Sequence, residues 1–185
     1  GGMRDHIGGG FHRYSVDAEW RVPHFEKMLY DQSQLVLAYL EAFQVTGDDF
    51  HAAVAEDTLE YVLREMTGPE GGFHSAEDAD SLPPGQTGEP RKMEGAFYIW
   101  SIDEIREALG DDAEIARLRF GIEEGGNAPS DPQGEFPGKN LLYVAQPVGA
   151  IAARTGRSEA EVTEALGRIR RVLFERRASR PRPHR

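Results

Sequence analysis

The sequence predicts a mainly α-helical protein, namely a partial (α/α) toroid of helical hairpins with a short β-ribbon. In several segments apolar residues recur at steps of three and four, which is the spacing of one helix face. These segments are separated by short turns within a pair and by long glycine-rich loops between pairs. Helical hairpins that stack and gather their loops at one end build a ring with a site at its mouth.

The first predicted hairpin joins a helix at about 23–45 to a helix at about 48–66. Pro23 suits the first turn of a helix, Gly47 suits its left-handed cap, and Asp48 is the expected N-cap of the second helix. The short connection makes the two helices antiparallel. The predicted buried face of the first helix consists of Phe25, Met28, Leu29, Gln32, Val36, Tyr39, Leu40 and Phe43. Leu35 and Leu37 widen it, so this helix is expected to be covered on more than one side. The predicted buried face of the second helix consists of Phe50, Val54, Leu59, Val62, Leu63 and Met66.

The second half is predicted to hold the ribbon and the remaining helices. Residues 72–76 should pair with 96–100 across an irregular polar insert. Ser101-x-x-Glu104 and Ser158-x-x-Glu161 are capping boxes, and they open helices that run to Leu109 and to about Arg177. Further helices are expected at 112–120 and 147–154, a loop at 121–139, and a short strand at 140–144.

Composition limits the class of protein. The net charge is −11, and because the ten Arg and four Glu from Arg154 onward carry +6, the rest carries −17. Such acidity disfavours nucleic acid as a partner, and no apolar run reaches the roughly 20 residues of a membrane span. The chain has no Cys, hence no disulfide and no thiolate metal site. A cytoplasmic protein is expected, with a toroid domain at 1–177 and a basic, Pro-rich tail at 178–185 that leads to a missing segment. The tail either binds phosphate or is only a basic helix end and linker.

The first polar cluster spans residues 5–14 and surrounds three consecutive glycines. Glycine lets the backbone turn sharply or approach a ligand closely. His12 can act as an acid or base near neutral pH, Arg13 can fork onto a carboxylate or phosphate, and Tyr14 lies beside them. The pattern matches neither a P-loop nor a dinucleotide fingerprint. A tight structural loop remains the alternative.

The second cluster spans residues 23–32 and includes Glu26. On a helix, His24, Lys27 and Asp31 share one face, and a helix start offers free N–H groups to an anion. The alternative is a solvated face with a weak Lys27–Asp31 ion pair.

The third cluster holds four acids, Glu77, Asp78, Asp80 and Glu94. Paired carboxylates carry out glycoside hydrolysis, clustered oxygens hold calcium or magnesium, and an acidic solvated turn is the remaining possibility. A zinc site would need His6, His12, His24 and His74, but no His-x-x-x-His occurs on a predicted helix. No Gly-x-Ser-x-Gly supports a serine hydrolase.

Four motifs occur in a specific order: Gly8-Gly-Gly-Phe-His-Arg-Tyr-Ser15, Pro23-His-Phe-Glu-Lys-Met-Leu-Tyr-Asp-Gln32, Ser75-Ala-Glu-Asp-Ala-Asp-Ser81 and Glu94-Gly-Ala-Phe-Tyr-Ile-Trp100. Together they resemble the thioredoxin domain-containing protein family related to spermatogenesis-associated protein 20. The resemblance implies an N-terminal thioredoxin-like domain followed by an (α/α)6 toroid, similar to N-acylglucosamine 2-epimerases and six-hairpin glycosidases. The thioredoxin-like domain and its cysteine motif are absent from this chain, so no redox activity is carried over.

Two functions follow as hypotheses. The first is a carbohydrate-type site, epimerase- or glycosidase-like, without a metal or other cofactor. Its expected catalytic residues are His12, His24, Glu77 and Asp78, and its expected substrate-binding residues are Arg13, Tyr14, Glu26, Lys27, Asp31, Asp80 and Glu94. The second is a non-catalytic binding or scaffold module that accompanies the missing thioredoxin-like domain and the remaining toroid helices. A partial toroid would also expose helix faces that pack on neighbours in the full ring, and it would then self-associate or be only marginally stable.

Overall fold

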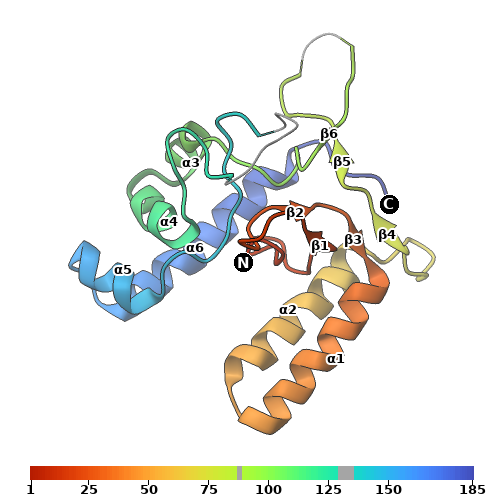
Figure 1. Cartoon of the computed structure of the whole chain (residues 1–185), viewed down its shortest axis with the longest axis horizontal. Helices are drawn as coiled ribbons and strands as arrows, with labels where there is room; N and C mark the ends of the chain where they lie inside the picture. Colours follow the sequence, from red (N-terminus) through yellow and green to blue (C-terminus); the bar gives the residue numbers. More distant parts are fainter. Residues whose placement is uncertain (87–88, 129–135) are drawn as a thin grey trace.

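The computed structural model describes residues 1–86, 89–128 and 136–185, and this part of the chain is mainly α-helical. Figure 1 shows one helical hairpin projecting from a second group of helices, with short strand pairs and loops at the junction. The hairpin consists of α1 (Leu29–Thr46) and α2 (Asp49–Glu65); the second group consists of α3 (Ile102–Leu109), a 3-10 turn (Gly110–Asp112), α4 (Ala113–Phe120), α5 (Val148–Thr155) and α6 (Glu159–Ala178). None of the helices described is both apolar enough and long enough to span a bilayer.

The hairpin closes as its turn chemistry predicts. Gly47 takes a left-handed φ of 66° at the end of α1, and the side chain of Asp48 accepts a hydrogen bond from the Phe50 amide at the start of α2. The two helices pack against each other along their length. The predicted antiparallel hairpin is therefore confirmed.

The predicted start of the first helix at Pro23 is wrong, because α1 begins at Leu29. Residues 23–28 are extended instead. Pro23–His24 (β2) pairs with Tyr14–Ser15 (β1), and Lys27–Met28 (β3) pairs with Ala76–Glu77 (β4). The partner of β3 is about 50 residues away in the sequence, and the partner of β2 lies within the glycine-rich loop region, so the helical spacing of residues 23–32 did not indicate either pairing.

Part of the predicted buried face is also wrong. Phe50, Leu59 and Leu63 are 55%, 46% and 66% exposed, and Leu37 is 62% exposed. The residues of α2 that are buried are Val54, Ala55, Asp57, Thr58, Tyr61 and Glu65. Since α1 and α2 pack mainly on each other, an apolar face of this hairpin is left uncovered within the described residues.

The second helical group follows the prediction closely. Both capping boxes form. The side chains of Ser101 and Ser158 each accept a hydrogen bond from the amide three residues on, and the carboxylates of Glu104 and Glu161 each accept one from the N-cap amide. The helices enclose a core to which the N-terminal loop contributes Ile7. The carbonyl of Ile7 also accepts a hydrogen bond from Arg170, which joins the glycine-rich loop to α6.

The predicted ribbon between 72–76 and 96–100 is wrong. Asp80–Ser81 (β5) pairs instead with Met93–Glu94 (β6), and β4 pairs with β3. Gly95, with a φ of 70°, turns the chain, and the amides of Tyr98 and Ile99 bond back to its carbonyl rather than across a ladder. The strand expected at 140–144 reduces to one bridge between Trp100 and Asn140.

Candidate functional site

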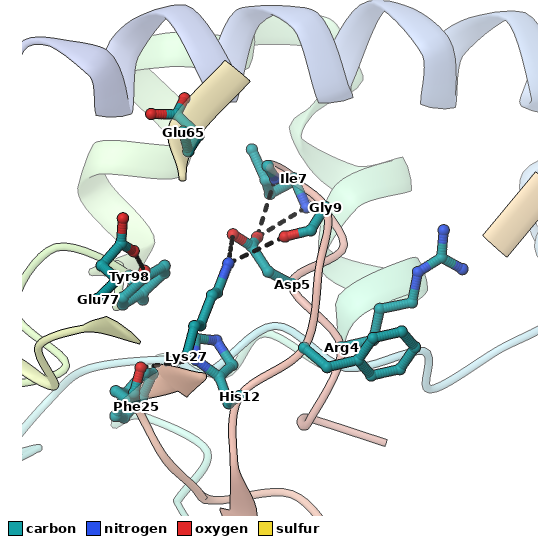
Figure 2. A network of polar contacts seen from close by, with 12 residues as sticks. Arg4, Asp5, Ile7, Gly9, His12, Phe25, Lys27, Glu65, Glu77 and Tyr98 are labelled. Carbon is teal, nitrogen blue, oxygen red and sulfur yellow. Dashed lines mark hydrogen bonds and ion pairs between the residues drawn. The ribbon is translucent and has the colours of Figure 1, made fainter. Parts of the chain in front are cut away.

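The glycine-rich loop wraps around the side chain of Asp5. Its Oδ1 accepts hydrogen bonds from the amides of Ile7 and Gly8, and Gly9 and Gly10 take positive φ values that turn the chain back. Figure 2 shows Asp5 at the centre of the polar contacts that result. We call the buried group around it the inner cluster, which consists of Asp5, His12, Lys27, Glu77, Tyr98 and Arg177.

Lys27 is fully buried and is held by the loop. Its Nζ donates to Asp5 Oδ2 and to the Gly9 carbonyl, each at 2.9 Å (Figure 2). The ammonium also lies 4.2 Å from the ring centre of Tyr61. Burial lowers the pKa of Lys27, and the charges of Asp5 and Glu77 oppose that change. The alternative of a Lys27–Asp31 pair on a helix face is wrong, because β3 directs Lys27 inward.

Arg177 of α6 completes the cluster with a two-pronged contact to Asp5 at 2.9 and 2.8 Å. Burial alone would raise the pKa of Asp5, but the charges of Arg177 and Lys27 outweigh it and hold that pKa well below its ordinary value. Asp5 therefore stays ionised, and two buried cations share one carboxylate. This arrangement ties the first residues of the chain to its last helix.

His12 and Glu77 lie in the same buried region. The Nδ1–H of His12 donates to the Phe25 carbonyl at 2.9 Å, because a carbonyl can only accept. Burial, together with the charge of Lys27, lowers the pKa of His12 to about 3, so the ring is neutral near neutral pH. Glu77 accepts hydrogen bonds from the Tyr98 hydroxyl and from Arg185. The ring of His12 meets Tyr98 edge-on at 4.6 Å, so the first and third sequence clusters do converge.

The remaining predicted residues lie nearer the surface, in a group that we call the rim cluster. Its members are Arg13, Tyr14, His24, Glu26, Asp31, Asp78, Asp80 and Glu94. The pairing of β1 with β2 places Tyr14 opposite His24, and the pairing of β5 with β6 places Asp80 opposite Glu94.

At the centre of the rim cluster, His24 bonds to Glu94 across 70 residues. The His24 Nδ1 lies 2.7 Å from Glu94 Oε1, which also accepts the Phe25 amide at 3.1 Å. The carboxylate thus accepts from Nδ1–H, and the other ring nitrogen, Nε2, lies 3.8 Å from Glu26. The Tyr14 ring stacks on His24 with centres 4.9 Å apart and is itself 49% exposed.

The acids of the rim cluster crowd one another. Burial raises the pKa of Asp80, and the neighbouring charges of Asp78 and Glu94 raise it further. Burial also raises the pKa of Asp31, whose Oδ2 has no hydrogen-bond partner among the described residues. Asp78 pairs with Lys92 at 3.3 Å, and Glu26 with Arg13 at 3.0 Å. Crowding of this kind is typical of carboxyl groups at functional sites.

The structure thus divides the predicted site residues into two groups. His12, Lys27 and Glu77 belong to the inner cluster, where every charge is matched, and the other eight lie in the rim cluster. Among the described residues, no three His, Asp or Glu side chains gather in a way that would hold a metal ion. Sequence reasoning missed the roles of Arg177 and Tyr98. No local signal marked Arg177, since its partner Asp5 is 172 residues away.

Comparisons with known proteins show relatives along the whole chain. The chain is 45% identical to human Spermatogenesis-associated protein 20, 43% identical to its mouse counterpart and 41% identical to its rat counterpart. Each alignment covers 100% of this chain but only 24–25% of the relative. The chain therefore spans about a quarter of the length of these relatives. No family model matches the chain.

Proposed function

From the 41–45% identity to one quarter of these longer proteins, we propose that this chain forms part of an (α/α)6 toroid whose rim cluster contributes to a carbohydrate-type site. The chemistry would be epimerase- or glycosidase-like. The remaining toroid helices and a thioredoxin-like domain would come from sequence outside this chain.

The observation that carries the proposal is the pair His24–Glu94 beneath the exposed ring of Tyr14. Because Glu94 accepts the Nδ1–H, the second ring nitrogen, Nε2, carries the lone pair that a general base needs. Asp80, whose pKa is raised by burial and by Asp78 and Glu94, is the matching candidate acid. Sugar epimerisation and hydrolysis require a base and an acid. They also use an aromatic face for the sugar ring and carboxylates that accept hydrogen bonds from its hydroxyl groups. His12 and Glu77 would support this rim from below, while Asp78 and Asp31 would bind hydroxyls.

The uncovered hairpin face supports the toroid part of the proposal. On α2 the exposed Leu59 and Leu63 lie one turn apart, and on α1 the exposed Leu37 and Leu40 do the same. Exposed apolar residues grouped on one helix face mark a contact with another element. Neighbouring hairpins of a ring would cover it. The same face favours a second candidate, a non-catalytic binding module, since a scaffold needs an apolar contact surface but no reactive rim.

Substitution of His24 distinguishes the two candidates. The His24→Gln chain should lose about tenfold in affinity for any sugar that the parent binds, because the imidazole nitrogen that hydrogen-bonds to the ligand is removed. Isothermal titration against hexoses, N-acetylhexosamines and short oligosaccharides measures this. The matched control is His51→Gln, a histidine of α2 outside the rim cluster. Absence of binding by the parent, or equal losses in both variants, would contradict a sugar site at the rim.

A further inference from the structure

The residues that follow α6 fold back over two buried carboxylates. We call residues 179–185 the strap. Arg185 donates from Nε to Glu77 at 2.8 Å and from Nη2 to Glu65 at 2.6 Å, and Arg182 donates to Glu65 as well. The His184 carbonyl accepts the Asp78 amide at 2.8 Å. The strap therefore attaches to α2 and β4 through its side chains and to the Asp78 amide through its backbone.

The two carboxylates are more deeply buried than the arginine that joins them. The side chains of Glu65 and Glu77 are 9% and 3% exposed, whereas that of Arg185 is 22% exposed. Burial alone would raise the pKa of Glu65, but its bond to Arg64 and the charges of Arg182 and Arg185 lower it. The two carboxylates thus form a buried site for a cation, and the side chain of Arg185 enters this site from the solvent side.

A small cavity beneath the strap contains one unused polar group. The cavity has about 20 Å³ of free volume and is lined by Lys27, Tyr61, Glu65, Glu77 and Arg185, among others. That volume holds about one water molecule. The hydroxyl of Tyr61 is buried and has no hydrogen-bond partner among the described residues. A buried polar atom without a partner calls for an explanation such as a bound ligand or water.

We propose that Glu65, Glu77 and Tyr61 form a binding site for a small guanidinium compound, which Arg185 of the strap occupies in this structure. The two donors of Arg185 reach two different carboxylates, which is the forked geometry that a planar guanidinium provides and an ammonium does not. A free guanidinium is not tethered to residue 184, so it can settle deeper than Arg185 and donate to the Tyr61 hydroxyl as well. Ligand and strap compete for the site, so binding of the ligand releases the strap.

The test uses agmatine as the probe. The Arg185→Gln chain should bind agmatine at least about tenfold more tightly than the parent chain, because the competing guanidinium is gone. Adding Glu77→Gln to that variant should remove the binding. The matched control is Arg176→Gln. It removes an arginine near the end of α6 that pairs with the exposed Glu107 of α3, and it should leave agmatine affinity at the parent's value.

A second measurement needs no variant. In the parent chain, saturating agmatine should accelerate amide exchange at Asp78, since the carbonyl that protects this amide belongs to the strap. Equal agmatine affinity in the parent and Arg185→Gln chains would overturn the proposal, and so would binding that survives Glu77→Gln. Unchanged exchange at Asp78 under saturating agmatine would also overturn it, even if the variant failed to fold. None of these outcomes depends on the sugar site at the rim.

Discussion

Replacement of Asp5 with Asn should lower the free energy of unfolding by about 3–5 kcal/mol. The variant keeps the size of the side chain but removes the charge that Lys27 and Arg177 share, so that two buried cations lose their common partner. Single domains are stable by about 5–15 kcal/mol, and the loss is therefore a large part of the total. Urea unfolding followed by far-UV circular dichroism measures it.

An exposed ion pair provides the control for Asp5. Glu114 and Arg117 lie one helical turn apart on α4 at 2.7 Å, with side chains that are 55% and 37% exposed. Pairs of this kind contribute about 0–1 kcal/mol because water and salt screen them. A Glu114→Gln chain should thus unfold almost like the parent. If Asp5→Asn cost no more than Glu114→Gln, the inner cluster would not be what joins the N-terminal loop to α6.

Replacement of Gly10 with Ala should cost about 2–5 kcal/mol. Gly10 has a φ of 73°, and an added Cβ would lie 2.5 Å from Cδ1 of the Tyr61 ring. The left-handed conformation costs an alanine about 1–2 kcal/mol, and forcing a methyl group into a packed site adds about 1–3 kcal/mol. Thermal or urea unfolding again gives the measurement.

Gly47 separates the cost of the left-handed backbone conformation from the cost of the steric clash. It has a similar φ of 66°, but an added Cβ would meet no atom within 4 Å. Gly47→Ala should therefore cost only the conformational part, about 1–2 kcal/mol. Equal losses for Gly10→Ala and Gly47→Ala would mean that the loop does not pack tightly against Tyr61, contrary to the close approach described above.

Local signals predicted the elements whose causes are local. Ser101 and Ser158 begin helices where their capping boxes lie, and Gly47 ends α1. The start of α1 was missed because residues 23–28 are fixed by strands at Tyr14–Ser15 and Ala76–Glu77, which local periodicity does not reveal. The exposure of an apolar helix face was missed for a similar reason, since it depends on which neighbours are present.

The candidate site shows the same limit. The residue types at His24, Asp80 and Glu94 indicated acid–base chemistry. The structure brings them together through the pairing of β5 with β6, which sets Asp80 opposite Glu94, and through the hydrogen bond between His24 and Glu94. Local patterns could not separate Lys27 and His12 from these residues, because their burial depends on the contact between Asp5 and Arg177, which lie 172 residues apart.

The division into a structural inner cluster and a ligand-binding rim is tested most directly by mapping where a sugar binds. The measurement is a titration of the isotope-labelled chain with the sugar panel, followed by two-dimensional NMR. The account predicts saturable shifts at Tyr14, His24 and Glu94, with Asp5 and Lys27 unchanged. No saturable shift at the rim with any sugar, or shifts confined to residues elsewhere, would contradict it.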